Sequence, residues 1–348
     1  MLEKLRVCMT REMLTPAGEY PEHIRDLPLL QNPRVDFVPC PRVEKVLPPE
    51  VIRDFDACLV GFALVNHDTF RGVERVCCMS RWGVGYDNVD PKACTDNDVV
   101  LITTRGALDY SVAESAISYM LALSHKMLLK HRHAAANDWS QRLTTLGNEI
   151  REKTIGIVGL GAIGAALLKL LAPFQPGRIL VFDPFLNDAR AKELAIEKTD
   201  LATLLKESDM VSIHCPKTPE TTNLIDAKHF AQMKPSAYLI NTARGGIVNE
   251  QALSVALCTG QIRGAGIDVF ESEPPPADHP LLKLDNVILS PHANSLTQEC
   301  FRDIGLHITR NLTRLISGEC PEFAINREVF DRPKFREKLA RLKARMAQ

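Results

Sequence analysis

Three side chains in the second half of the sequence could together perform acid–base chemistry on a small carboxylic acid: Arg244, Glu273 and His292. A guanidinium can hold a carboxylate and polarise a neighbouring ketone. An imidazole can donate a proton to a developing alkoxide, and a carboxylate beside it favours its charged form and fixes its orientation. Because each residue follows a predicted strand, we expect the three to meet at one sheet edge. The set predicts catalytic residues for the interconversion of a 2-oxo acid and a 2-hydroxy acid.

The segment Gly159-Leu-Gly161-Ala162-Ile163-Gly164 has the spacing of a dinucleotide-binding loop. It follows one predicted strand and opens a predicted helix, which is the context that this spacing needs. The first two glycines allow a tight turn and close approach to a pyrophosphate, and the third lets the helix pack on the strand. The free N–H groups at the start of the helix attract phosphates. We therefore predict that these residues bind the cofactor.

Asp183 ends the next predicted strand, 24 residues after Gly159. A carboxylate there can accept hydrogen bonds from both ribose hydroxyls and repels a 2′-phosphate. Pro184 and Phe185 follow, so this turn offers no arginine for such a phosphate. The pattern favours NAD over NADP, and the alternative is that Asp183 only caps its turn.

Short apolar strands alternate with helical stretches between Thr154 and Pro291. This alternation predicts a parallel sheet covered on both faces, and right-handed crossovers make it doubly wound. The strands are predicted at 155–159, 179–182, 210–214, 237–240, 266–270 and 287–290. The first hundred residues repeat the theme more weakly, with strands predicted at 5–8, 35–38, 57–60 and 99–102.

Two further helices are predicted. One long helix is expected from about Ser111 to Ala136. The basic stretch from Lys334 to Gln348 places its apolar residues on one helical stripe, namely Phe335, Leu339, Leu342 and Met346. This stripe predicts a helix lying on its own subunit or on a neighbour, and the alternative is a basic binding arm.

The composition is that of a globular protein. The 348 residues are 45% apolar and 24% charged, with a formal net charge of -1, so nothing points to nucleic acid or a membrane as partner. The charged start from Met1 to Arg6 lacks the apolar core of a signal peptide. None of the ten cysteines forms a C-x-x-C pair. We therefore predict reduced thiols in a cytoplasmic protein and no metal site.

Ordered motifs from about Ser80 to Gly318 resemble the D-isomer-specific 2-hydroxyacid dehydrogenase family. They are Gly83-Val-Gly-Tyr-Asp-Asn-Val-Asp90, Ser111-Val-Ala-Glu114, Lys153-Thr-Ile-Gly-Ile-Val-Gly-Leu-Gly161, His214-Cys-Pro-Lys-Thr-Pro-Glu-Thr221, Met233-Lys-Pro235, Asn241-Thr-Ala-Arg-Gly245, Gly266-Ile-Asp-Val-Phe-Glu-Ser-Glu-Pro274 and Ser290-Pro-His292. By this resemblance, Arg244 binds the substrate carboxylate and ketone, Glu273 supports the imidazole, and His292 is the proton donor or acceptor.

The resemblance also assigns binding residues. Backbone N–H groups of Val84 and Gly85 would give the second contact to the substrate carboxylate, and Asp268 would hold the nicotinamide carboxamide. The further cofactor-binding residues that it implies are His214, Cys215, Pro216, Thr242 and Ala243. Glu273 argues against the formate dehydrogenase branch, which has Gln beside its His.

The family resemblance implies an α/β protein with two doubly wound parallel-sheet domains. A Rossmann nucleotide domain, 114–296, would be inserted into a discontinuous flavodoxin-like substrate domain, 1–113 and 297–330, with a basic helical tail at 331–348. Family members are usually homodimers built through the nucleotide domain.

The sequence departs from the family before Ser111, where relatives read P-G-A-N and this chain reads Arg105-Gly-Ala-Leu108. We expect Arg105 to meet a distal anion of the substrate, and the alternative is a solvent-facing arginine. The loop 61–65 has no cation for a phosphate, and no regulatory domain follows the core, which disfavours 3-phosphoglycerate. Phe62, Leu64 and Leu108 predict a partly apolar pocket for glyoxylate, hydroxypyruvate or a branched 2-oxo acid.

Two other functions stay open at this stage. The first is an NAD(H)-sensing corepressor-like binding protein, which shares the fold and the three catalytic groups; this chain lacks the long disordered flanks that would recruit partners. The second is a dehydrogenase of another substrate, such as phosphite, on the same scaffold. Turnover of phosphite with NAD would identify it.

Overall fold

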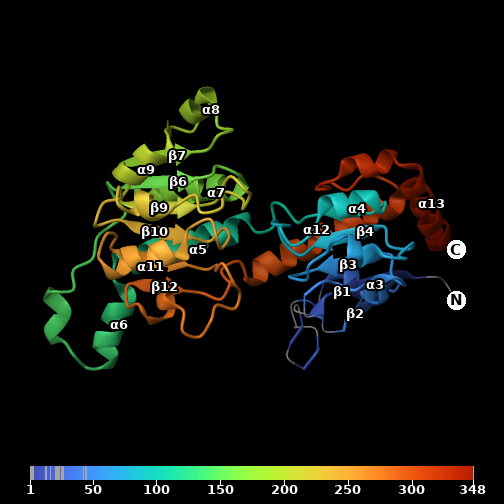
Figure 1. Ribbon diagram of the computed structural model, residues 1–348, viewed down its shortest axis with the longest axis horizontal. Helices are drawn as coiled ribbons and strands as arrows, with labels where there is room; N and C mark the ends of the chain where they lie inside the picture. The colour runs from blue at the N-terminus through green and yellow to red at the C-terminus, as the bar shows by residue number, and fades with distance from the viewer. Residues whose placement is uncertain are drawn as a thin grey trace. The chain divides into compact units, whose positions relative to one another are not determined.

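The computed structural model describes residues 4–11, 14, 15, 17–19, 24, 27–41, 43 and 45–347. The chain divides into two compact units (Figure 1). The first unit joins Met1–Leu108 to Thr297–Gln348, and the second unit is Asp109–Leu296. The boundary before the second unit lies five residues before the predicted one, and the tail from 331 is part of the first unit. Among the described helices, none is long and apolar enough to cross a membrane.

The first unit contains a five-stranded parallel sheet of order β2-β1-β3-β4-β5. Its strands are β1 (Leu5–Met9), β2 (Val35–Pro39), β3 (Ala57–Val60), β4 (Cys78–Arg81) and β5 (Val100–Ile102). Strand β4 was missed in the sequence because it ends in Ser80 and Arg81, yet all four of its residues are buried. The all-parallel order confirms the predicted doubly wound fold class.

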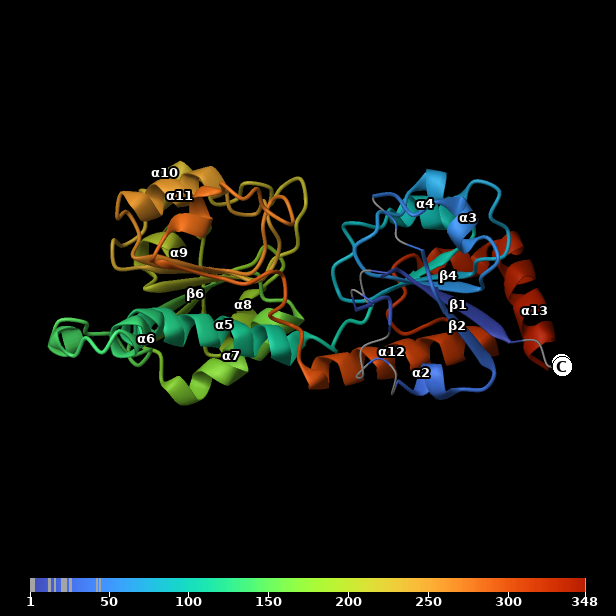
Figure 2. The ribbon, with the colours of Figure 1, turned by 90° about the horizontal axis from the view of Figure 1, so that it is seen from below.

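Helices cover both faces of this sheet (Figure 2). Helices α3 (Pro49–Ile52) and α4 (Pro91–Asp96) lie on one face, and α2 (Pro28–Gln31) and α12 (Gln298–Ser317) lie on the other. Each face has its own apolar core, one around Ile308 and Leu312 of α12 and one around Ile52, Val76 and Leu101.

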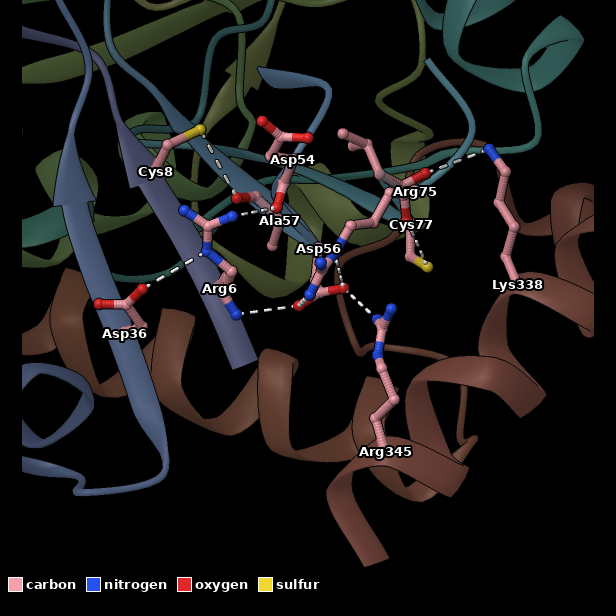
Figure 3. Close-up of polar contacts among 11 residues, drawn as sticks. Arg6, Cys8, Asp36, Asp54, Asp56, Ala57, Arg75, Cys77, Lys338 and Arg345 are labelled. Atoms are coloured by element: carbon pink, nitrogen blue, oxygen red, sulfur yellow. Dashed lines mark hydrogen bonds and ion pairs between the residues drawn. The ribbon is translucent and has the colours of Figure 1, made fainter. Parts of the chain in front are cut away.

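The C-terminal helix α13 (Pro333–Ala347) packs on the first unit. All four residues of its predicted apolar stripe are buried in the core around α12, so the helix lies on its own subunit. The Lys338 ammonium donates hydrogen bonds to three backbone carbonyls, the shortest 2.8 Å to Asn97, and Arg345 forms an ion pair with buried Asp56 (Figure 3). The Arg75 guanidinium binds both carboxylate oxygens of the same Asp56, at 2.9 and 3.0 Å. Lys338 and Arg345 therefore hold α13 against the segments that precede β3, β4 and β5.

The second unit contains a seven-stranded parallel sheet of order β12-β11-β10-β9-β6-β7-β8. Its strands are β6 (Thr154–Val158), β7 (Arg178–Phe182), β8 (Glu197–Lys198), β9 (Met210–Ile213), β10 (Tyr238–Asn241), β11 (Gly264–Ile267) and β12 (Val287–Leu289). The six predicted strands correspond to all of these except the two-residue β8. Strand β11 begins two residues and ends three residues earlier than predicted.

Two layers of helices enclose this sheet (Figure 2). Helices α9 (Leu201–Glu207), α10 (Ala227–Phe230) and α11 (Glu250–Cys258) cover one face, and α5 (Asp109–Ser124) and α7 (Ala162–Leu171) cover the other. Helix α8 (Asp188–Glu193) lies between β7 and β8 in the chain.

The single helix predicted from Ser111 to Ala136 is wrong, because the structure has two helices there. Helix α5 ends at Ser124 and α6 (Met127–Ala135) follows, with Lys126 in the left-handed region at φ +54°. The carbonyl oxygen of Ser124, at the end of α5, accepts a hydrogen bond from Asn148 N at 2.8 Å. A Cβ on Gly147 would lie only 2.7 Å from that oxygen. A returning segment therefore occupies the position where the helix would continue.

Candidate active site

The glycine-rich loop joins β6 to α7 as predicted and leaves one side open. Gly159 has φ +92°, and a Cβ there would lie 2.7 Å from Cys215 N. A Cβ on Gly164 would lie 2.4 Å from Gly159 O, so the third glycine lets helix and loop touch. A Cβ on Gly161 would meet nothing within 4 Å. The loop thus fits a pyrophosphate approaching at Gly161, beside the N-terminus of α7 that includes Ala162 and Ile163.

Asp183 supports this loop as well as its own turn. One carboxylate oxygen accepts a 2.7 Å hydrogen bond from Leu160 N in the glycine-rich loop. The other accepts a 2.8 Å hydrogen bond from Phe185 N, so the turn-capping contact is present. Each carboxylate oxygen has a second lone pair that a ribose hydroxyl could use.

The segment after β9 lies against the first glycine of the loop. His214 N donates a 2.8 Å hydrogen bond to Val158 O, and its imidazole Nε2 lies 2.8 Å from Ser212 Oγ. Burial lowers the pKa of His214 to about 4, so the ring is uncharged near neutral pH. Its Nδ1 is buried and has no hydrogen-bond partner among the described residues. Cys215 and Pro216 follow, and Cys215 is partly exposed.

Strands β10, β11 and β12 are neighbours, and the three predicted catalytic residues follow their carboxyl ends. Arg244 comes after β10 and is partly buried; one of its terminal nitrogens donates a 2.8 Å hydrogen bond to Ala243 O. The neighbouring Thr242 has a buried hydroxyl with no partner among the described residues. A Cβ on Gly245 would lie 1.9 Å from Phe270 O, so the Arg244 segment packs backbone to backbone on the segment after β11.

Glu273 and His292 form the central pair of this sheet edge. His292 Nδ1 lies 2.7 Å from one Glu273 oxygen, and Phe270 N donates a 3.0 Å hydrogen bond to the other. Burial alone would raise the pKa of Glu273, but the hydrogen bonds from His292 and Phe270 and the charges of His292 and Arg244 bring its pKa below the usual value. The carboxylate is therefore ionised at neutral pH, and the structure brings Glu273 and His292 together as predicted.

Asp268 holds the backbone that presents His292. Its carboxylate is buried and accepts hydrogen bonds from Ala293 N at 2.9 Å and Asn294 N at 3.3 Å. Its carbonyl oxygen accepts a 2.7 Å hydrogen bond from His292 N. His292 has φ +51°, which is strained for a residue other than glycine. The sequence motif contained Asp268 but not this supporting contact.

A second supporting contact that the sequence did not predict lies behind Glu273. Glu250, the first residue of α11, accepts a 2.5 Å hydrogen bond from Glu271 N, and its other oxygen lies 2.9 Å from His279 Nε2. The His279 ring packs edge-on against Phe270, with ring centroids 5.9 Å apart. Glu250 therefore ties down both ends of the loop 271–279 that carries Glu273. Glu250 and His279 are 29 positions apart in the sequence, so local patterns do not reveal this contact.

The predicted residues Val84, Gly85 and Arg105 lie in the first unit, after β4 and β5. Thr104 N donates a 3.0 Å hydrogen bond to Gly83 O, so the loop that holds Val84 and Gly85 adjoins the segment that begins Thr104-Arg105. Val84 and Gly85 are partly exposed and Arg105 is exposed.

Arg81 is a cation near the loop 61–65 that was not among the predicted site residues. Its guanidinium lies 5.8 Å from the ring centroid of Phe62. It donates hydrogen bonds to Val60 O, Trp82 O and Asn88 Oδ1, and the residue is buried. Arg81 therefore braces the loop that precedes Val84.

Comparisons with known proteins agree with this geometry. The model of the D-isomer specific 2-hydroxyacid dehydrogenase NAD binding domain matches residues 117–294. A glyoxylate reductase of Korarchaeum cryptofilum is 37% identical over 285 residues, covering 80% of this chain and 85% of that protein. A D-3-phosphoglycerate dehydrogenase of Archaeoglobus fulgidus is 36% identical over 262 residues, covering 75% of this chain and 49% of that protein, so the chain spans about half the length of this relative.

A solved structure shows the same fold. The NAD-dependent formate dehydrogenase of Staphylococcus aureus in complex with NAD superimposes with a TM-score of 0.78 at 26% identity, covering 90% of this chain and 96% of that one. The predicted oxidoreductase class and the NAD cofactor are confirmed together with the fold class. The chain belongs to the D-isomer-specific 2-hydroxyacid dehydrogenase family.

Proposed function

We propose that this protein interconverts a small 2-oxo acid and the corresponding D-2-hydroxy acid with NAD(H). The observation that supports this most directly is the 2.7 Å contact between His292 and Glu273 at the sheet edge that also carries Arg244. When bound, NADH supplies the hydride. Gly159, Gly161 and Gly164 would hold its pyrophosphate, and Asp183 would accept its ribose hydroxyls and disfavour NADPH.

The chain's own residues would manage the proton and the charge. Arg244 binds the substrate carboxylate and polarises its C2 carbonyl. The His292 imidazolium gives its Nε2 proton to the carbonyl oxygen as that oxygen gains charge. Glu273, ionised at neutral pH, stabilises the imidazolium through Nδ1 and keeps the ring oriented. In the reverse direction, neutral His292 takes the proton from the hydroxyl.

The other assignments rest on the resemblance and on local geometry. Val84 and Gly85 N–H groups would give the second contact to the substrate carboxylate. Arg105 lies in the segment that adjoins them in the first unit and would meet a distal anion only in a substrate that carries one. Asp268 would meet the nicotinamide carboxamide, while His214, Cys215, Pro216, Thr242 and Ala243 would line the rest of the cofactor site. The apolar side chains of Phe62, Leu64 and Leu108 would make the substrate pocket partly apolar, which favours glyoxylate, hydroxypyruvate or a branched 2-oxo acid.

A homodimer formed through the second unit is part of the proposal. Helix α6 has no buried residue, and Figure 1 shows it and the segment after it extending from the rest of the second unit. Large apolar side chains stand exposed there: Met127, Leu128, Leu129, Trp139, Leu143 and Leu146. An exposed apolar surface of this kind is typical of an interaction site. Light scattering of the purified chain should give twice the monomer mass, and Leu143→Glu should shift it toward the monomer.

All ten cysteines are present as thiols, which supports a cytoplasmic location within this proposal.

A substrate panel tests the function. Glyoxylate, hydroxypyruvate, a branched 2-oxo acid and 3-phosphohydroxypyruvate are each supplied with NADH or NADPH, and the nicotinamide absorbance is followed. We expect turnover of at least one of the first three with NADH preferred. Turnover only with NADPH would contradict the role of Asp183, and no turnover of any 2-oxo acid would contradict the proposed reaction.

A further inference from the structure

Three cysteine thiols from separate segments meet inside the first unit: Cys8, Cys40 and Cys58. Cys8 on β1 and Cys58 on β3 are paired residues of neighbouring parallel strands. Cys40 follows β2, and its N–H donates a 2.7 Å hydrogen bond to Met9 O. The three sulfur atoms lie within 4.8 Å of one another.

The thiol cluster is closed off from solvent in the described structure. Cys8 and Cys58 have no exposed surface and Cys40 is 4% exposed, and all three belong to the apolar core around Leu47, Ile52 and Val60. The Cys8 sulfur lies 3.7 Å from Ala57 O (Figure 3) and the Cys58 sulfur 3.9 Å from Leu59 O. Weak contacts to backbone oxygens thus direct these two sulfurs within an otherwise apolar layer.

The spacing of the sulfurs fits a shared metal ion. A metal–sulfur bond of about 2.3 Å places the three sulfurs of a trigonal site about 4.0 Å apart. The three thiols are already within 4.8 Å, so rotations of side chains would close the site without moving a strand. Met79 adds a fourth soft atom to the same layer, because it pairs with Cys58 across β3 and β4 and is fully buried in the same core.

We propose that Cys8, Cys40 and Cys58 form a sulfur-only binding site for Cu(I). Thiolate and thioether sulfur select soft ions, and Cu(I) accepts low coordination. Structural zinc almost always takes four ligands, whereas no His or carboxylate joins the three cysteines in the described part of the chain. As each S–Cu bond forms with a deprotonating cysteine, its proton leaves to solvent, and the copper stays Cu(I), so no oxidant or reductant is consumed.

Occupancy would link β1, β3 and the end of β2 through one ion. A ligand that binds only the folded state raises its stability, so copper would stabilise the first unit. The earlier expectation of no metal rested on spacing along the sequence, which does not reveal ligands that come from three separate strands and loops.

The test uses the full chain, reduced and without oxygen. Cu(I) is supplied as a complex with a weak ligand, and loosely held copper is then removed with a Cu(I) chelator. We expect one retained equivalent, sulfur-only coordination by X-ray absorption, and a raised Tm. Zn(II) supplied in the same way should not be retained by this site. Failure to retain copper, or nitrogen or oxygen ligands around it, would overturn the proposal.

Matched variants locate the copper. Cys58→Ala and Cys40→Ala should each lose the retained equivalent of copper. Cooperative unfolding is checked for both variants, and one folded variant is enough to test the site. Cys78→Ala is the control, because Cys78 is equally buried but belongs to the core on the opposite face of the same sheet. Retention that survives the first two changes, or that is lost equally in the control, would contradict the assignment. NADH turnover is measured separately, so failure of the proposed reaction would not affect this result.

Discussion

The carbonyl oxygen of Asp268 accepts a 2.7 Å hydrogen bond from His292 N while the Asp268 carboxylate binds the next two N–H groups. Together these bonds hold His292 at φ +51°. A strained backbone of this kind costs about 1–3 kcal/mol and persists only where its surroundings enforce it. The position of the imidazole over the sheet edge therefore depends on a carboxylate that need not touch the substrate.

We predict that Asp268→Asn lowers kcat by about 10- to 100-fold, because a shift of the reacting group by about 1 Å costs this much. The amide keeps the size of the side chain but weakens the hold on the two N–H groups. Steady-state kinetics with NADH and the best 2-oxo acid measure it. Asp285→Asn, at an exposed carboxylate paired with Arg132, is the control and should leave kcat unchanged. A kcat of Asp268→Asn equal to that of the wild type would argue against the positioning role of Asp268.

Glu273→Gln should lower kcat by about 100-fold, since the imidazolium loses its ionised partner. The lowered pKa of Glu273 also gives a stability prediction. A depressed carboxyl pKa stabilises the folded state above the ordinary glutamate pKa, and this contribution disappears as the pH falls through the lowered value. The difference in unfolding free energy between the wild type and Glu273→Gln should therefore shrink in acid. Urea unfolding at a series of pH values measures it, and a pH-independent difference would argue against the pairing.

Glu250 should act as a positioning residue for the loop 271–279. Glu250→Ala removes both its contact with Glu271 N and its contact with His279, so Glu273 becomes less well fixed, and we expect kcat to fall about tenfold. Glu250→Gln can still accept the hydrogen bond from Glu271 N and should recover most of the loss. KM for NADH should change little, because the glycine-rich loop is not part of this contact. An equal fall in kcat in both variants would indicate a general structural effect and not positioning by Glu250. A rise in KM for NADH as large as the fall in kcat would indicate the same.

Asp56 should be the most sensitive carboxylate for the stability of the first unit. It is 1% exposed and binds Arg75, Arg345 and Arg6 N. Asp56→Ala removes the buried carboxylate that Arg75 and Arg345 share, and we expect a loss of about 3 kcal/mol in unfolding free energy. Glu197→Ala, which breaks an exposed pair with Arg178, should cost less than about 1 kcal/mol. Denaturant unfolding measures the loss of unfolding free energy in both variants. Similar losses would contradict the larger stabilising role predicted for the buried Asp56.

Local patterns predicted the parts of the fold that depend on near neighbours in the chain. The parallel strands, the glycine-rich turn and the placement of Arg244, Glu273 and His292 all follow from residue types at strand ends. The break at Lys126 was not predictable, because it depends on Gly147 and Asn148 packing against Ser124 O. Long-range polar contacts were missed for the same reason.

Two of those missed contacts bear on function and stability. Glu250 meets His279 across 29 residues, and Arg345 meets Asp56 across 289 residues. Neither contact has a sequence signature. A charged residue that is exposed to solvent and one that forms a long-range ion pair cannot be told apart from the sequence, because the pairing depends on the fold. The basic tail illustrates this, since Lys338 and Arg345 belong to the basic stretch 334–348 for which a binding arm was the alternative, and both hold α13 on the first unit.

The central claim is that His292 transfers the proton at this sheet edge. The most direct measurement is kcat of His292→Ala with NADH and the best 2-oxo acid, with NADH affinity checked by fluorescence titration. We predict a fall of about 10²- to 10⁴-fold in kcat with NADH binding retained. A variant that turns over at the wild-type rate would contradict the assignment of His292 and the mechanism built on it.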